Sequence, residues 1–340
     1  MLGDADSGAI WAAGGGDWHG AGVWRSLDHG QSWSLSKLAG GQADAWAASD
    51  PAVASQLGME AGPPAPFTDR ITALWSLGYS NGTVYAGAKP ATLFASRDGG
   101  ASWNIVQGLS DHPSNESWQP GAVGLTLHTI LSDPGDGAKL WVGISAAAVF
   151  ASEDGGQTWD RRNRLSNAVA PGTHSHPAAP CGSDTGLCVQ NLVRTPGETV
   201  YQQNHHGTYR SRDGGRNWDD ITHGLPSTFG FPIAVDPGDP DTIWVVPLNG
   251  DNDGRFAPGG RAAVWRSRDG GETWERLTRG LPEQAFFTVL RQGMATDAAG
   301  GVFFGTNSGS VFASRDKGES WDEVARHLPT VLSVETLSVT

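Results

Sequence analysis

Cysteine and basic residues are both scarce in this sequence. Two cysteines, Cys181 and Cys188, occur in 340 residues, too few for a disulfide-rich scaffold or for a zinc centre built on thiolates alone. Their closeness permits a small disulfide loop, and a pair of unreactive thiols is the alternative. The 23 Lys and Arg stand against 36 Asp and Glu, and the resulting charge of −13 disfavours nucleic acid and anionic membranes as partners.

Long apolar runs are lacking too. No run approaches the roughly 20 residues that span a bilayer, so no membrane partner is expected. The first residues, MLGDADSGAIW, show neither the basic nor the apolar region of a secretion signal. We therefore expect a soluble monomer that is either cytoplasmic or secreted with its signal removed. The 48 Gly and 20 Pro predict many turns, and the 15 Trp predict a substantial core.

One short motif recurs six times along the chain. Its copies read Ser-x-Asp-x-Gly-x-Ser/Thr/Asn-Trp and occupy residues 26–33, 96–103, 152–159, 211–218, 267–274 and 314–321. A β-rich run precedes each copy and another follows it, which predicts two strands joined by a tight turn. We expect the Asp to accept hydrogen bonds from its own turn, the Gly to adopt a positive φ and the Trp to anchor the core.

These residues are the Asp-box motif, and the chain resembles the Asp-box (bacterial neuraminidase repeat) β-propellers. That group includes sialidases, xyloglucanase-type glycosidases, sortilin-type receptors and a photosystem assembly factor. The chain is also similar to bacterial sialidase-like, or "glycosyl hydrolase", repeat proteins in segments such as YQQNH and GFPIAVDP. The resemblance implies an all-β fold: a six-bladed β-propeller of four-stranded antiparallel blades, forming one domain over residues 1–340. No strand precedes AIWAAG in the first blade, so the C-terminal VLSVETLSV is expected to close the ring there.

The Asp boxes and the irregular loops are expected on opposite faces. Every Asp box falls between a third and an outer strand, and its repetition favours a structural staple over a catalytic group. The loops of the other face differ in every blade, and irregular loops on a rigid scaffold are where binding and catalysis concentrate. Six of the ten His lie in those loops, and His128 lies near the same end of an inner strand. We therefore predict a pocket rich in His and Asp at the channel mouth.

The candidate residues of this pocket fall into three groups. The acid–base candidates are one carboxylate and four imidazoles: Asp111, His112, His128, His205 and His206. The substrate-binding candidates are aromatic, cationic, imidazole or amide side chains: Trp18, His19, Arg70, Lys89, Trp118, Gln190, Gln203, Asn204, Arg291 and Gln292. His174 and His176 are spaced as ligands of a divalent metal ion. Packing, a water-filled channel and the ordinary enrichment of polar loops in His are the alternatives for these residues.

The resemblance to sialidases does not extend to their catalytic residues. That family is expected to carry an Arg-Ile-Pro motif, three arginines and a tyrosine nucleophile. This sequence has no Arg-Ile-Pro, and its four tyrosines lie in strand bodies or at the wrong end. It therefore predicts a sialidase-like hydrolase, not a true sialidase, that acts on a carbohydrate-like or other small polar substrate. The alternatives are a non-catalytic propeller that binds a protein or glycan, and a metal-dependent hydrolase or oxidase.

Overall fold

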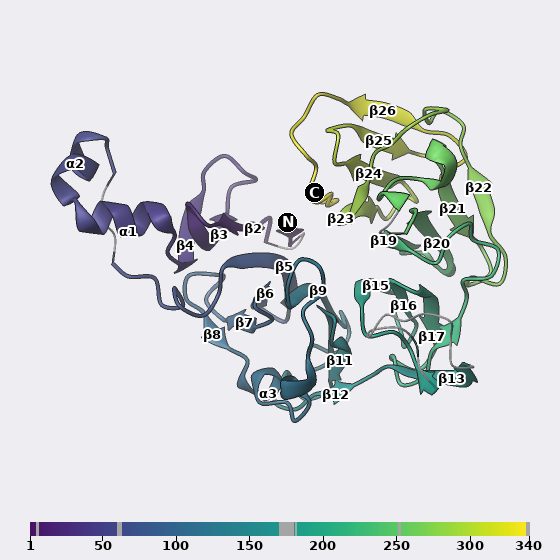
Figure 1. Cartoon of the computed structure of the whole chain (residues 1–340), viewed down its shortest axis with the longest axis horizontal. Helices are drawn as coiled ribbons and strands as arrows, with labels where there is room; N and C mark the ends of the chain where they lie inside the picture. The colour runs from purple at the N-terminus through teal and green to yellow at the C-terminus, as the bar shows by residue number, and fades with distance from the viewer. Residues whose placement is uncertain (5–6, 60–62, 170–179, 181, 251–252, 338–340) are drawn as a thin grey trace. The chain divides into compact units, whose positions relative to one another are not determined.

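The chain is built mostly of strands (Figure 1). The computed structural model describes residues 1–4, 7–59, 63–169, 180, 182–250 and 253–337. Across these ranges the strands form six four-stranded sheets and one two-stranded sheet, and the registered pairs are antiparallel. None of the helices in the described ranges is long and apolar enough to cross a membrane. The prediction of an all-β fold built from four-stranded antiparallel sheets is confirmed.

Each four-stranded sheet is made from four consecutive strands. The first three contain β1 (Leu2–Gly3), β2 (Ile10–Gly16), β3 (Gly20–Ser26) and β4 (Ser34–Ala39); β5 (Ala73–Ser80), β6 (Thr83–Lys89), β7 (Leu93–Ser96) and β8 (Asn104–Ile105); and β9 (Thr126–Ser132), β10 (Leu140–Ser145), β11 (Ala148–Ser152) and β12 (Asp160–Arg161). The last three contain β15 (Val189–Arg194), β16 (Val200–Asn204), β17 (Gly207–Ser211) and β18 (Asp219–Asp220); β19 (Gly230–Asp236), β20 (Asp239–Pro247), β21 (Val264–Ser267) and β22 (Glu275–Leu277); and β23 (Val289–Thr296), β24 (Val302–Thr306), β25 (Val311–Ser314) and β26 (Asp322–Ala325). The two-stranded sheet pairs β13 (Arg164–Val169) with β14 (Gly182–Asp184).

The chain divides into two compact units. Unit 1 is mainly residues 1–144 with 152–159, and unit 2 is residues 145–151 with 160–337. Within unit 1, β5 contacts both β2 and β9; within unit 2, the first strands β15, β19 and β23 of three successive sheets contact one another. Apolar side chains fill the space between neighbouring sheets, and the aromatic rings of Phe304, Phe312 and Trp321 pack together in unit 2.

Two parts of the chain differ from the sequence-based expectation. β1 pairs with β2, so Leu2–Gly3 takes the place that was assigned to the C-terminal segment. Within unit 2 that segment instead lies along the last sheet, where Ser333 forms a parallel bridge with Gln292. The long connection after β4 was expected to be a loop, but it contains α1 (Gln42–Ser49) and α2 (Pro51–Gln56), and Asp50 caps α2 through the backbone N–H of Val53. A shorter helix, α3 (Gln107–Ser110), follows β8.

The Asp-box turns have the predicted structure in all six copies. In each, the Asp Oδ1 accepts a hydrogen bond of 2.8–2.9 Å from the backbone N–H four residues later, and Oδ2 accepts one from that residue's side chain. The Ser at the start of the box donates to the same Oδ1. The glycine at the fifth position has a φ between +85° and +97°, a region that side chains disfavour. The six aspartates are therefore structural staples.

Because of these hydrogen bonds, we expect the stability of the folded protein at low pH to depend on the Asp boxes. Bonds from the hydroxyl and backbone of residue 32 lower the pKa of Asp28 to about 2, and those from Thr158 lower the pKa of Asp154 to about 2. A lowered folded-state pKa gives stability that is present above the ordinary value near 3.8 and is lost as pH falls towards 2. We expect Tm to fall steeply between about pH 4 and pH 2, and the Asp154→Asn variant to have a lower Tm at pH 7 but a shallower fall. Calorimetry that finds the same pH dependence in both proteins would contradict this assignment.

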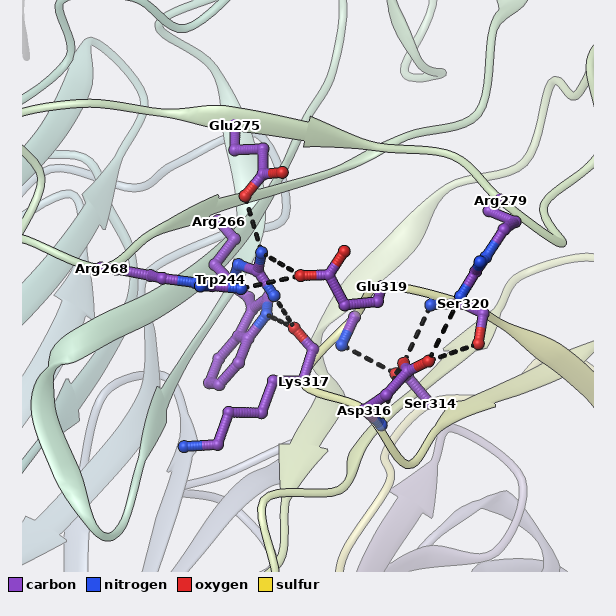
Figure 2. Close-up of polar contacts among 11 residues, drawn as sticks. Trp244, Arg266, Arg268, Glu275, Arg279, Ser314, Asp316, Lys317, Glu319 and Ser320 are labelled. Carbon is purple, nitrogen blue, oxygen red and sulfur yellow. Dashed lines mark hydrogen bonds and ion pairs between the residues drawn. The ribbon is translucent and has the colours of Figure 1, made fainter.

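A buried arginine joins the last two sheets of unit 2 (Figure 2). Arg266 in β21 is 1% exposed and donates through Nη1 to the backbone carbonyl of Lys317, 2.6 Å away in the last Asp box. Its Nη2 pairs with Glu275 at 2.6 Å and with Glu319 at 2.7 Å. The indole N–H of Trp244 donates to the same Lys317 carbonyl. The guanidinium of Arg266 thus bonds its own sheet to the Asp box of the following sheet.

Candidate functional site

Each of the three first strands of unit 2 carries a β-bulge. The regular register with the neighbouring strand is interrupted at residues 189–191 of β15, 230–233 of β19 and 289–294 of β23. The interruptions contain Gln190, Phe231 and Arg291, respectively. A bulge bends its strand and redirects a side chain, and bulges are common beside functional sites. Because these three strands contact one another, their bulges bring side chains from three sheets together.

Arg291 is the centre of this group. Its Nη2 donates to the side-chain carbonyl of Gln190, and its own backbone carbonyl accepts a 2.6 Å bond from Asn191. The guanidinium carbon lies 4.9 Å from the centre of the Phe231 ring, a cation–π distance. The Nε of Arg291 is buried and has no hydrogen-bond partner within the described ranges. In the same ranges no carboxylate forms an ion pair with this guanidinium.

A second guanidinium shares the aromatic surface. Arg255 lies 5.6 Å from the centre of the Phe231 ring and 6.0 Å from that of Phe229. Burial lowers the pKa of Arg291 to about 10, and the charge on Arg255 acts in the same direction, against an opposing effect of Cys188. Arg291 therefore stays a cation at neutral pH. Two cations and two phenyl rings make this part of unit 2 locally positive in a protein whose net charge is −13.

Two imidazoles lie next to the phenyl rings. His205 and His206 form the turn between β16 and β17, and their rings are 4.8 Å apart. The His205 ring is also 4.7 Å from the Phe229 ring, and its backbone N–H donates to the carbonyl of Cys188. We call six residues of this region the Arg291 cluster: Gln190, His205, Phe229, Phe231, Arg255 and Arg291.

The neighbouring amides bond mainly to the protein itself. Both Gln203 and Asn204 are buried. The Nε2 of Gln203 donates to the backbone carbonyls of Asn204, Gly207 and Thr228, and Nδ2 of Asn204 donates to the carbonyl of Gly186 at 2.6 Å. The Oδ1 of Asn204 accepts from the backbone of His206. These two residues thus hold the histidine turn in place.

One group of the predicted residues lies in unit 1, in the connection between α3 and β9. There His112 Nδ1 lies 2.8 Å from the hydroxyl of Ser114, and the buried Trp118 donates its indole N–H to the same hydroxyl at 2.9 Å. The carboxylate of Asp111 is exposed and accepts a 2.8 Å bond from Gln107. The structure brings these three predicted residues into one loop, where their contacts are local.

The remaining predicted residues are scattered. In unit 1, His128 is buried in β9 beside Thr129, while Lys89 ends β6. Three others in unit 1 are exposed: Trp18, His19 and Arg70. In unit 2, Gln292 lies in the same bulge as Arg291 and bonds the C-terminal segment through its backbone. His174, His176 and Cys181 lie outside the described residues, within which no three His, Cys, Asp or Glu residues form a group able to hold a metal ion.

The two phenylalanines and the contact of Arg255 with them were missed from the sequence. Phe229 and Phe231 belong to the strand segment FGFPIAV and are not among the histidine, carboxylate and other candidates predicted from the sequence. One signal was present, because proline disrupts a strand and Pro232 stands inside GFPIAV at the bulge. A proline at that place indicates an irregular strand whose neighbouring side chain leaves the regular pattern.

Comparisons with known proteins agree with the repeat. The family model for the BNR/Asp-box repeat matches residues 265–276. An oligoxyloglucan-reducing end-specific xyloglucanase of Emericella nidulans is 23% identical over 223 residues, which are 58% of this chain and 26% of that protein. A solved xyloglucanase from Xanthomonas campestris gives a TM-score of 0.62 at 18% identity, over 96% of this chain and 46% of that one.

A second kind of protein shares the fold. The solved structure described as YCF48 bound to D1 peptide gives a TM-score of 0.53 at 14% identity, over 92% of this chain and 76% of that one. This chain spans only 20–26% of the curated xyloglucanases that it matches. At these identities the solved structures share an all-β, propeller-like fold with this chain and establish nothing about its activity.

Proposed function

We propose that this Asp-box repeat protein is a hydrolase-like propeller directed at carbohydrate, and that its ligand is a saccharide that carries a carboxylate. The site is the Arg291 cluster of unit 2. One observation carries the proposal: the guanidinium of Arg291 contacts a phenyl ring and an amide, and no carboxylate pairs with it in the described ranges. The xyloglucanase relatives favour carbohydrate as the class of ligand.

The buried positive charge of Arg291 favours an acidic ligand. A half-buried cation loses hydration, and a ring and an amide compensate it less well than a carboxylate does. A guanidinium offers five N–H donors in a planar fork that matches the two oxygens of a carboxylate. Arg291 uses one nitrogen on Gln190, and the rest of its fork has no acceptor among the residues that the structure describes. The nearby Arg255 raises the local potential further.

The rest of the cluster positions Arg291. Phe229 and Phe231 are 2% and 3% exposed, so their rings pack beneath the guanidiniums, and the buried amide of Gln190 bonds Arg291 and the sulfur of Cys188. His205, in contact with Phe229, is the proposed proton donor or acceptor in hydrolysis, since imidazole exchanges protons near neutral pH. Asp111, His112 and His128 belong to unit 1, and the proposal does not rest on them.

We further propose that the six four-stranded sheets are the blades of one propeller domain over residues 1–340. The observation in favour is that successive sheets within each unit contact one another through their first strands, as blades do around a channel. The C-terminal segment bonds to β23, the first strand of the last sheet. Small-angle scattering of the purified chain would test this, because a single closed propeller has one compact particle size.

A ligand panel tests the function. Calorimetric titration with glucuronate and with oligogalacturonate should give heat of binding, and titration with the neutral oligosaccharide of matched length should give at least tenfold weaker binding at this site. Hydrolysis of the acidic oligosaccharide should then be lost in the His205→Ala variant while binding is kept. The proposal fails if neutral and acidic saccharides bind the Arg291 cluster equally, or if neither binds there.

A non-catalytic binding protein is the second candidate. One observation favours it: the chain covers most of the protein solved as YCF48 bound to D1 peptide, but under half of the solved xyloglucanase. In that case the cluster would hold the carboxylate of a peptide. Binding of a peptide carboxylate at the Arg291 cluster, together with no turnover of any saccharide, would favour this candidate over the first.

A further inference from the structure

The hydrogen bond from Arg266 to the next Asp box recurs elsewhere in the chain. Arg25, Arg210 and Arg266 each precede the first serine of an Asp box. Each donates through Nη1 to the carbonyl at the fourth position of the next box, on Gly99 at 3.3 Å, Gly270 at 2.7 Å and Lys317 at 2.6 Å, respectively. At the junction before the fourth box, Arg162, which directly follows β12, makes the equivalent 2.7 Å bond to Gly214.

Carboxylates accompany Arg210 and Arg266 at two fixed positions, where Arg25 has Ser34 and Ala101 instead. One is the residue directly after the box tryptophan, as in Asp219 beside Arg210 and Glu275 beside Arg266. The other is the sixth position of the next box, as in Glu272 beside Arg210 and Glu319 beside Arg266. Figure 2 shows the arrangement around Arg266, in which a cation and two anions fill the space between neighbouring sheets.

The junction between the second sheet and the third box departs from this pattern at all three positions. Ala95 stands at the position of Arg25, Arg210 and Arg266, as Ala151 and Ala313 do before the third and sixth boxes. It is paired with Tyr85 across the strands as Arg266 is paired with Trp244. Asn104 and Gln157 stand where the two carboxylates are expected. All of these residues lie in unit 1. The cation and both anions are thus replaced together by neutral groups.

A cavity of about 620 Å³ lies at this junction. Six of its lining residues are Tyr85, Ala95, Arg97, Asp98, Asn104 and Gln157. The volume falls within the range of small-molecule sites, which is about 300–1,000 Å³. Ala95 lines this cavity, whereas Arg266 occupies the corresponding position in the junction of the last two sheets.

We propose that this cavity binds a neutral, hydroxyl-rich ligand, namely one sugar unit of a saccharide. Amide and phenol groups on Asn104, Gln157 and Tyr85 hydrogen-bond hydroxyls without requiring a charge. The two positions that hold carboxylates beside Arg210 and Arg266 are neutral here, and the oxygens of Asp98 already accept bonds from its own turn. Arg97 is exposed to solvent. The neutral amide and phenol groups of the lining are those that bind a neutral sugar.

The test restores the charged junction. In the variant Ala95→Arg with Asn104→Glu and Gln157→Glu, the new arginine should fill the cavity as Arg266 does. The probes are glucose and xylose, with arginine amide as the cationic comparator, measured by ligand-observed NMR and calorimetry. Binding of the neutral sugar should fall at least tenfold in the filled variant, while the Arg268→Ala variant, whose arginine is 60% exposed and belongs to neither site, should bind it as the wild type does.

Two results would overturn the proposal. One is equal affinity of glucose and xylose for the wild-type and filled proteins, or no binding of either. The other is tighter binding of arginine amide than of the sugars. If the triple variant fails to fold, Gln157→Ala serves instead: it should weaken sugar binding severalfold with an unchanged Tm, and an unchanged affinity would equally refute the site. Because the probes are neutral, these outcomes do not depend on the acidic site in unit 2.

Discussion

The Arg266→Ala variant should lose about 2–4 kcal/mol of folding free energy, the larger of the stability effects expected from a single arginine in this chain. Arg266 is 1% exposed and bonds the Lys317 carbonyl together with two carboxylates. Its removal leaves a space between two sheets and withdraws one of the two donors to that carbonyl. Urea denaturation at neutral pH measures the loss.

Arg268 provides a matched control for this prediction. It pairs with the same carboxylate, Glu319, at 2.7 Å, but its side chain is 60% exposed. An exposed ion pair contributes under about 1 kcal/mol, so Arg268→Ala should have a small effect. An equal loss of stability in the two variants would mean that pairing with Glu319 accounts for the whole effect. The buried hydrogen bond from Arg266 to the Lys317 carbonyl would then contribute nothing, which contradicts the role given to Arg266.

The Arg291→Gln variant should bind an acidic saccharide about 10- to 100-fold more weakly than the wild type. The substitution removes the positive charge and the planar fork while it keeps an amide of similar reach. Arg291→Lys restores the charge without the fork and should recover part of the affinity. Calorimetric titration with glucuronate, alongside a thermal unfolding curve for each variant, separates binding from stability.

Arg276 offers a control for the loss of charge alone. It lies in β22 of the same unit, is exposed, and is not part of the Arg291 cluster. Arg276→Gln removes the same charge from the protein, so it should leave the affinity for glucuronate within about twofold of the wild type. A comparable loss in both variants would show that the general potential, and not the fork of Arg291, attracts the ligand.

The repeat made most of the fold predictable. The motif at residues 267–274 fixes a turn, the turn fixes the two strands that it joins, and five further copies extend the same reasoning along the chain. The second through sixth sheets accordingly follow the expected strand order. The first sheet did not, because a two-residue strand such as Leu2–Gly3 carries no periodicity that identifies it.

The candidate site was predictable only in part. Gln190, His205 and Arg291 were chosen from residue type and from their place in the repeat, and the structure does bring them into one unit. Phe231 was missed because a β-bulge decides which side chains meet, and a bulge changes register by residues that a pattern of alternation cannot locate. The junction arginines could not be predicted for another reason: Arg210 and Arg266 lie outside the repeated motif, and alanine occupies their position in three of the six repeats.

The most direct test of the account is a crystal structure of the chain with glucuronate bound. The account predicts that the carboxylate of the ligand lies within hydrogen-bonding distance of the Arg291 guanidinium. A ligand bound elsewhere on unit 2, or one whose carboxylate points away from Arg291, would contradict it.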